Sequence, residues 1–73
     1  MTYRRLINAP IIQGNTYRNG ISQFTVLELG VGEALVRNVV SGWVCRAHGP
    51  ALYMVDEDHM ELQWYYSTGG YFV

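Results

Sequence analysis

Glycines divide this chain into apolar segments that are each about as long as a single β-strand. They stand at positions 14, 20, 30, 32, 42, 49, 69 and 70. Glycine accepts the positive φ angles that tight turns require, so glycines between short apolar runs are typical of a β-meander or a small barrel. The spacing predicts strands at Tyr3–Ile7, Ile21–Leu29, Ala34–Val40, Trp43–Ala47, Ala51–Val55, Met60–Tyr66 and Tyr71–Val73.

The polar stretches between these runs are expected to be loops and turns. Asn15–Gly20 is predicted to be a polar loop. His48–Pro50 is predicted to be a turn, since glycine tolerates positive φ and proline cannot donate to a sheet ladder. Asp56–His59 is expected to be a solvated turn between two strands.

One segment fits two structures. Between Val31 and Val39 the apolar residues recur at helical spacing, and Glu33 and Arg37 form an i, i+4 pair. The valines of the same segment are β-branched and favour a strand. We therefore predict a mainly β fold, as a small antiparallel meander or an SH3-like barrel. The alternative is an α+β sheet with one short helix near residues 32–41.

Composition predicts one small domain over residues 1–73, because 49% of the chain is hydrophobic and only 15% is charged. A domain of this size buries only about 60% of the surface that its unfolded chain exposes, so we expect additional stabilisation. Cys45 is the only cysteine, which excludes an intramolecular disulfide, and a buried free thiol indicates a reducing compartment. Assembly into a homo-oligomer is the remaining route to stability.

The charge pattern disfavours nucleic acid as a partner. Five arginines, no lysine and six acidic residues give a net charge of -1, whereas duplex-binding surfaces carry clustered basic residues. The apolar runs are shorter than the roughly 20 residues that span a bilayer, and Asn8 and Pro10 interrupt the first of them. We therefore expect a cytoplasmic protein without membrane association.

Two of the predicted strands are apolar on both faces. Because side chains alternate along a strand, Leu52 and Met54 share one face of theirs, and Tyr53 lies on the other. Val44 likewise lies opposite Cys45. A chain of this length is not expected to cover both faces of a sheet. Leu52, Met54 and Val44 are therefore predicted to form an oligomer interface.

The strand expected at Met60–Tyr66 has one apolar face and one mixed face. The apolar face is predicted to join the core, and it consists of Met60, Leu62, Trp64 and Tyr66. On the mixed face an aromatic ring is flanked by a charge and an amide, a combination that suits the centre of a protein interface. We predict a binding surface formed by Tyr65, Gln63, Glu61 and, from the neighbouring strand, Tyr53.

No combination of residues indicates catalysis. Cys45 and His48 are close in sequence, but alternation places them on opposite faces of an extended strand. The acidic run at 56–61 offers oxygen ligands without the pattern of a calcium loop, so we interpret it as a solvated turn. We therefore predict no catalytic residue, no metal site and no cofactor.

Two short stretches resemble a known enzyme family. Val39–Cys45 resembles the Val-Gly-Trp-aromatic-Cys strand of the plasmid-borne type II dihydrofolate reductases, and Leu62–Tyr65 resembles their Val-Gln-Ile-Tyr strand. This resemblance spans 27 residues at most and implies an SH3-like barrel that assembles as a tetramer around a pore for NADPH and dihydrofolate. Gln63 and Tyr65 would then line the pore. Trp64 stands where the family has Ile, two residues are missing between the two stretches, and the chain has no lysine for the pore mouth.

Two functions from different classes are therefore carried forward. The favoured function is that of a small non-enzymatic protein that self-associates and binds a protein partner. Chains of this size and composition are typical of accessory proteins of phages or mobile elements, which is an analogy only. The alternative is a small oligomeric enzyme whose site is assembled between subunits, such as a dihydrofolate reductase-like pore with Gln63 and Tyr65.

Overall fold

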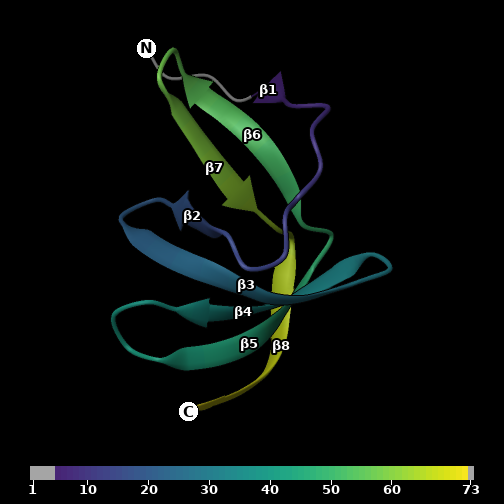
Figure 1. Cartoon of the computed structure of the whole chain (residues 1–73), viewed down its shortest axis with the longest axis vertical. Coiled ribbons are helices and arrows are strands. Elements are labelled where there is room, and N and C mark those ends of the chain that lie inside the picture. Colours follow the sequence, from purple (N-terminus) through teal and green to yellow (C-terminus); the bar gives the residue numbers. More distant parts are fainter. Residues whose placement is uncertain (1–4, 73) are drawn as a thin grey trace.

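The computed structural model describes residues 5–72, which form eight β-strands in a single sheet (Figure 1). The strands are β1 Arg5–Leu6, β2 Thr16–Asn19, β3 Ser22–Gly30, β4 Glu33–Asn38, β5 Trp43–His48, β6 Ala51–Asp56, β7 His59–Gln63 and β8 Tyr66–Phe72. Residues 5–72 contain no helix, and so none that is long and apolar enough to cross a membrane. The prediction of a mainly β fold is confirmed.

The segment that fitted both helix and strand is strand β4. Its Val36 pairs with Val26 of β3 and with Cys45 of β5, so β4 is hydrogen-bonded on both sides. The alternative of a helix near residues 32–41 is therefore wrong. Pairing on both sides outweighs the helical spacing because β-branched valines pack well on a pleated surface.

Strands β5 to β8 form one long antiparallel hairpin that bends in the middle. β5 pairs with β8 and β6 pairs with β7, and the same register continues across the bend. The bend lies where Gly49–Pro50 faces Trp64–Tyr65. Gly49 has a φ of 70° and Pro50 has no N–H to donate, so the ladder is interrupted there. We call β6 with β7 the upper arm and β5 with β8 the lower arm, after their places in Figure 1.

The meander of β2, β3 and β4 joins the two arms. β4 pairs with β5 of the lower arm, and β2 runs parallel to β7 of the upper arm, where Arg18 lies beside Glu61. The other strand pairs within residues 5–72 are antiparallel. The strand order is β1-β6-β7-β2-β3-β4-β5-β8, so over the described residues the sheet is mixed and is not closed into a barrel.

The structure moves several predicted boundaries. The polar loop expected at Asn15–Gly20 is wrong, because Thr16–Asn19 is β2 and forms a hairpin with β3. Gly20, with a φ of 62°, occupies the tight turn between them. In β2 only Tyr17 is buried, so the strand has too few apolar residues to be recognised. The first and last predicted strands are described only in part, because residues 1–4 and 73 lie outside the described range.

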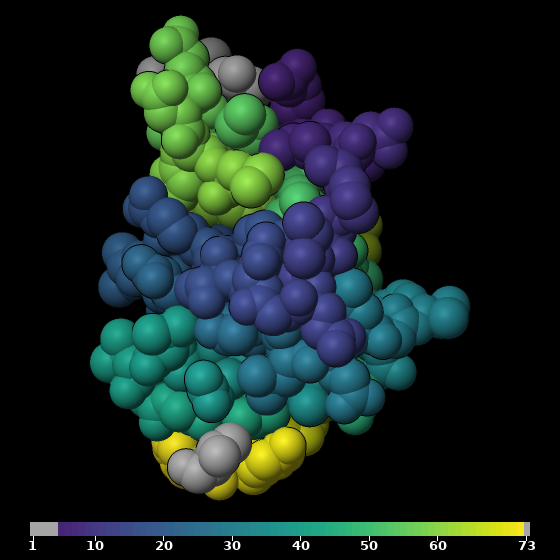
Figure 2. Space-filling model, viewed as in Figure 1, coloured from purple at the N-terminus to yellow at the C-terminus, as the bar shows by residue number. Residues whose placement is uncertain are grey.

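Side chains from the meander and from both arms form one apolar core. It consists of Tyr17, Val26, Ala34, Val36, Cys45, Ala47, Leu52 and Leu62. The segment between β1 and β2 packs Ile7 and Ile11 against this core. In Figure 2 the purple and blue atoms of that segment run down one side of the molecule and across the middle of its face. The buried hydroxyl of Tyr17 accepts a hydrogen bond from the Ile12 N–H at 3.0 Å, which satisfies the polar end of the ring.

Candidate functional site

The structure brings three of the four predicted binding residues together at the bend of the hairpin. Tyr53 from β6, Gln63 from β7 and Tyr65 from the bend line one small hollow with Gly49 and Trp64. The hollow has a volume of about 30 Å³, which is room for about two water molecules. Trp64, which alternation places on the other face, lines the same hollow because β7 ends at Gln63 and the chain bends there.

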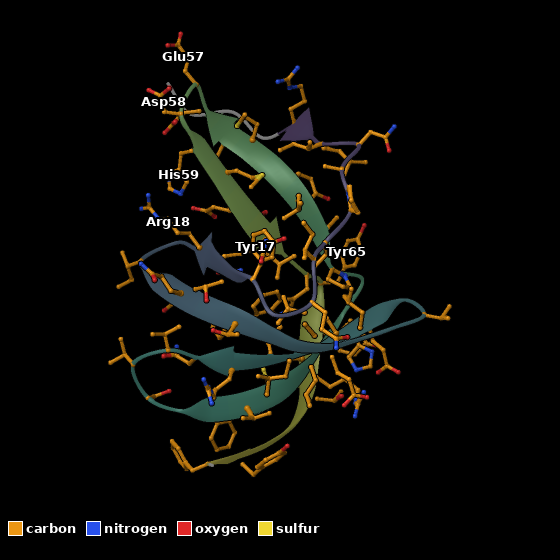
Figure 3. All side chains as sticks on the ribbon, viewed as in Figure 1. Tyr17, Arg18, Glu57, Asp58, His59 and Tyr65 are labelled. Carbon is orange, nitrogen blue, oxygen red and sulfur yellow. The ribbon has the colours of Figure 1, made fainter. Side chains whose placement is uncertain are left out.

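Tyr65 is the most exposed aromatic residue of this surface, with 83% of its area accessible, and yet it is held in place. Its N–H donates a hydrogen bond to the His48 carbonyl at 3.0 Å. Its ring lies so close to Gly49 that a Cβ atom there would collide with the ring carbons. Gly49 in turn donates to the Gly32 carbonyl at 2.9 Å, which ties the bend to the β3–β4 turn. The ring thus lies against Gly49 and otherwise faces outward, and Figure 3 shows it on the opposite side of the view from Arg18 and His59.

Glu61, the fourth predicted binding residue, is buried with only 7% exposed. Gln63 Nε2 donates to Glu61 Oε1 at 3.0 Å, and His59 Nε2 lies 2.9 Å from Glu61 Oε2. Within the described residues His59 Nε2 makes no hydrogen bond, so this second contact is a close approach without hydrogen-bond geometry. Glu61 therefore orients Gln63 from beneath the surface, and little of its own side chain is accessible to a partner.

The environment of Glu61 favours its charged form. Burial alone would raise its pKa, but hydrogen bonds from Gln63 and the Gly20 N–H outweigh burial, together with the positive charges of His59 and Arg18. The net result is a pKa below the ordinary glutamate value. The Glu61 carboxylate is therefore charged at neutral pH and accepts the hydrogen bond that orients Gln63.

The residues predicted to form an oligomer interface are largely covered by the chain itself. Leu52 is 3% exposed and belongs to the core, and Val44 is fully buried. Met54 is half-buried and pairs with Arg5 of β1 and Met60 of β7. The expectation that one chain cannot cover both faces overlooked the segment after β1, whose Ile7 N–H donates to the Leu52 carbonyl at 2.9 Å.

A second surface, on the lower arm, was not predicted from the sequence. All of β8 is exposed, and β8 is the last strand of the sheet. Trp43 packs against Gly70 and makes an edge contact with Phe72, with ring centroids 4.9 Å apart. Tyr71 and Phe72 are 53% and 68% exposed. The signal in the sequence is the uncharged run Tyr66–Phe72, in which aromatic residues flank two glycines.

The groups that suggested chemistry are separated from one another. Cys45 is buried, and burial raises the pKa of its thiol, an effect that a hydrogen bond with Ser67 partly offsets. The His48 ring stacks on Tyr66 with centroids 4.6 Å apart, and its Nε2 lies 2.7 Å from Thr68 Oγ1. Among residues 5–72 no group of three or more His, Cys, Asp or Glu side chains is placed to hold a metal ion.

Gln63 and Tyr65, the residues that the dihydrofolate reductase resemblance places in a pore, do line one hollow. That hollow is about 30 Å³, whereas sites for small molecules and cofactors usually measure about 300–1,000 Å³. A reductase-like site would therefore need walls from further copies of the chain. Comparison with known proteins finds no family model, no curated protein and no solved structure that matches this chain.

Proposed function

We propose that this chain is a small non-enzymatic binding protein that docks a protein partner on the surface around Tyr65. One observation carries the proposal: Tyr65 is 83% exposed, its backbone is hydrogen-bonded to the His48 carbonyl, and its ring lies against Gly49. Tyrosine is one of the residue types that most often dominate the binding energy of protein interfaces. Little conformational entropy is lost when such a ring is covered.

The groups around Tyr65 support a protein as the partner. Gln63 and Tyr53 line the same hollow, and Gln63 is oriented by Glu61 at 3.0 Å. An aromatic centre with polar neighbours is the usual composition of a protein interface. The hollow is too small to enclose a cofactor, so the geometry favours a partner protein that covers Tyr65 from outside.

The proposal includes self-association, through β8 in place of the buried Leu52 and Val44. β8 is an exposed sheet edge without a charged residue, and edges of this kind pair readily with another strand. A two-fold axis would bring β8 of one copy antiparallel to β8 of the next. The Gly69–Gly70 bulge divides this edge, so pairing would use residues 66–68 and 71–72.

A cytoplasmic location belongs to the same proposal. It is supported by the free, buried Cys45, since proteins without disulfides are typical of reducing compartments. An accessory role in a phage or mobile element remains an analogy drawn from size and composition.

Partner capture tests the role of Tyr65. The full chain serves as bait in a lysate of the source organism, with Tyr65→Ala, Tyr65→Phe and, as a control, Ile21→Ala, which truncates an exposed apolar residue on a distant turn. We expect one protein to be captured in stoichiometric amount by wild type and Ile21→Ala. Tyr65→Ala should lose about 1–3 kcal/mol of affinity, and Tyr65→Phe less. Equal capture by wild type and Tyr65→Ala would refute the proposal.

Two further measurements separate this proposal from its alternatives. Unfolding curves should show that Tyr65→Ala is as stable as Ile21→Ala, while Trp64→Ala loses about 3 kcal/mol because Trp64 packs on Phe24 and the core. A thermal-shift screen with nucleotides and folates tests the enzyme alternative. Saturable stabilisation by NADPH or dihydrofolate, lost in Tyr65→Ala, would favour the enzyme.

Light scattering over a series of protein concentrations tests self-association. We expect a mass above that of the 8.3 kDa chain for wild type. Tyr71→Lys should return the mass to one chain, because it places a charge in the proposed apolar contact. Ile21→Lys, which adds the same charge elsewhere, should stay associated. Wild type at 8.3 kDa throughout would refute association.

A further inference from the structure

A groove lies on the meander, and it shares no residue with the hollow beside Tyr65. It measures about 530 Å³ and is lined by Thr16, Gln23, Thr25, Arg37, Val39, Val40, Ser41 and Gly42. The tips of the β2–β3 and β4–β5 hairpins lie on the same side of the molecule in Figure 1, and the groove lies between these two hairpins. Its volume falls within the range of sites for small molecules, about 300–1,000 Å³.

Arg37 is the charged residue of this groove, and no acidic side chain of the described residues pairs with it. Arg37 as a residue is half-buried, and within residues 5–72 its guanidinium makes no ion pair or hydrogen bond. Arg46, by contrast, forms an ion pair with Glu33, with the nitrogen and oxygen atoms 3.2 Å apart. No acidic residue lines the groove. A guanidinium without a counter-charge attracts an anion.

Neutral hydrogen-bond donors surround Arg37. Thr16, Thr25 and Arg37 are consecutive cross-strand partners, and the two threonine hydroxyls lie 2.9 Å apart. One of these hydroxyls donates to the other, so one O–H remains free. Ser41 Oγ accepts from the Trp43 N–H at 3.1 Å, which leaves its own hydrogen to donate. With the Gln23 amide, the groove presents donors of several kinds to an oxyanion.

The remaining wall of the groove is apolar and is held in a fixed shape. Val39 and Val40 are 49% and 93% exposed. Asn38 Oδ1 accepts hydrogen bonds from the N–H groups of Val40 and Ser41, both at 2.9 Å, so this turn is ordered without a ligand. Two exposed valines beside an unneutralised arginine match a molecule with one anionic end and one apolar end.

We propose that this groove binds a small organic oxyanion, a phosphate monoester or a carboxylate, whose charged group contacts Arg37 and whose apolar part lies on Val39 and Val40. A single guanidinium with hydroxyl donors suits one anionic group and not a polyanion, in agreement with the net charge of -1. The inference goes beyond the proposed function, because the Tyr65 surface shares no residue with the groove.

Backbone and arginine side-chain NMR spectra test the groove with three probes of similar shape. These are phenyl phosphate, benzoate and, as the uncharged control, benzamide. We expect saturable shifts at Thr25, Val39–Gly42 and the Arg37 Nε–H with at least one of the two anions. Benzamide should produce none, because it lacks the charge. The anion that binds more tightly identifies the preferred oxyanion.

Variants assign the binding to Arg37. Arg37→Gln should weaken binding of the preferred anion by about tenfold or more, as expected for the loss of a charged hydrogen-bond donor. Arg37→Lys should restore part of it. Arg46→Gln, which removes a paired arginine nearby, should leave it unchanged. Absence of saturable shifts with both anions, or equal binding by Arg37→Gln, would overturn the inference. Partner capture through Tyr65 should be unaffected by Arg37→Gln, so the two proposals fail separately.

Discussion

The two arms of the bent hairpin share one register but differ in their surroundings. In the upper arm, β7 lies between β6 and β2, and its Leu62 is fully buried. In the lower arm, β8 is the last strand of the sheet, and all of its residues are exposed. The segment after β1 also covers the upper arm, where Ile7 packs on the core. Neighbouring strands and covering segments, more than the strand's own pattern, therefore decide which residues become core.

Truncating one apolar side chain in each arm should show the largest difference. Leu62→Ala is expected to lower the free energy of unfolding by about 2–5 kcal/mol, because it leaves a cavity in the core. Phe72→Ala should cost about 1 kcal/mol, since the exposed ring loses chiefly its edge contact with Trp43. Urea unfolding measures both, and Leu62→Val gives a graded value if Leu62→Ala does not fold. Equal losses in the two arms would contradict the comparison.

The bend between the arms supplies the next largest effect. Gly49→Ala adds a Cβ that meets the Tyr65 ring at a φ of 70°, so both backbone strain and a collision are expected. We expect a loss of more than about 1 kcal/mol in the free energy of unfolding. Gly14→Ala is the matched control, because Gly14 also has a positive φ, of 93°, but its Cβ would enter open space.

The two glycine variants also test the position of Tyr65. Gly49→Ala should change the near-ultraviolet circular dichroism or the ring NMR signals of Tyr65, while Gly14→Ala should not. If the two variants lose the same stability and leave the Tyr65 signals unchanged, the ring is not held against Gly49.

The sequence predicted the features that depend on local pattern. Glycine spacing indicated strand-length segments, and alternation placed Leu62 and Trp64 toward the core and Tyr65 outward. Met60 and Tyr66 were expected in the same core face, but they are 40% and 59% exposed. They lie at the two ends of the predicted strand, next to the hairpin turn and beyond the bend.

The features that the sequence did not predict depend on which segments meet in space. β2 was missed because its partners β3 and β7 give it its place in the sheet, and its own residues are mostly polar. Leu52 and Val44 were assigned to an interface because no local pattern shows what covers them. Glu61 was expected at the surface, but it is buried. Its carboxylate contacts Gln63 and His59, and these contacts take the place of the water that burial removes.

The smallest expected difference concerns the charges of the two arms. The pKa of Glu61 in the upper arm is below the ordinary value of 4.5, since its hydrogen bonds and positive neighbours outweigh burial. A folded-state pKa below the unfolded one adds stability that is fully present above pH 4.5 and is lost as the pH falls through the folded value. In Glu61→Gln the free energy of unfolding should therefore decrease less than in wild type between neutral pH and a pH well below 4.5. Urea unfolding at the two pH values measures this difference. In the lower arm, Arg46 and Glu33 form an exposed pair at 3.2 Å, and Arg46→Gln should cost only about 0.2–1 kcal/mol, less in high salt. Acid sensitivity that is the same in wild type and Glu61→Gln would mean that the carboxylate is solvated and that the upper arm does not depend on its charge.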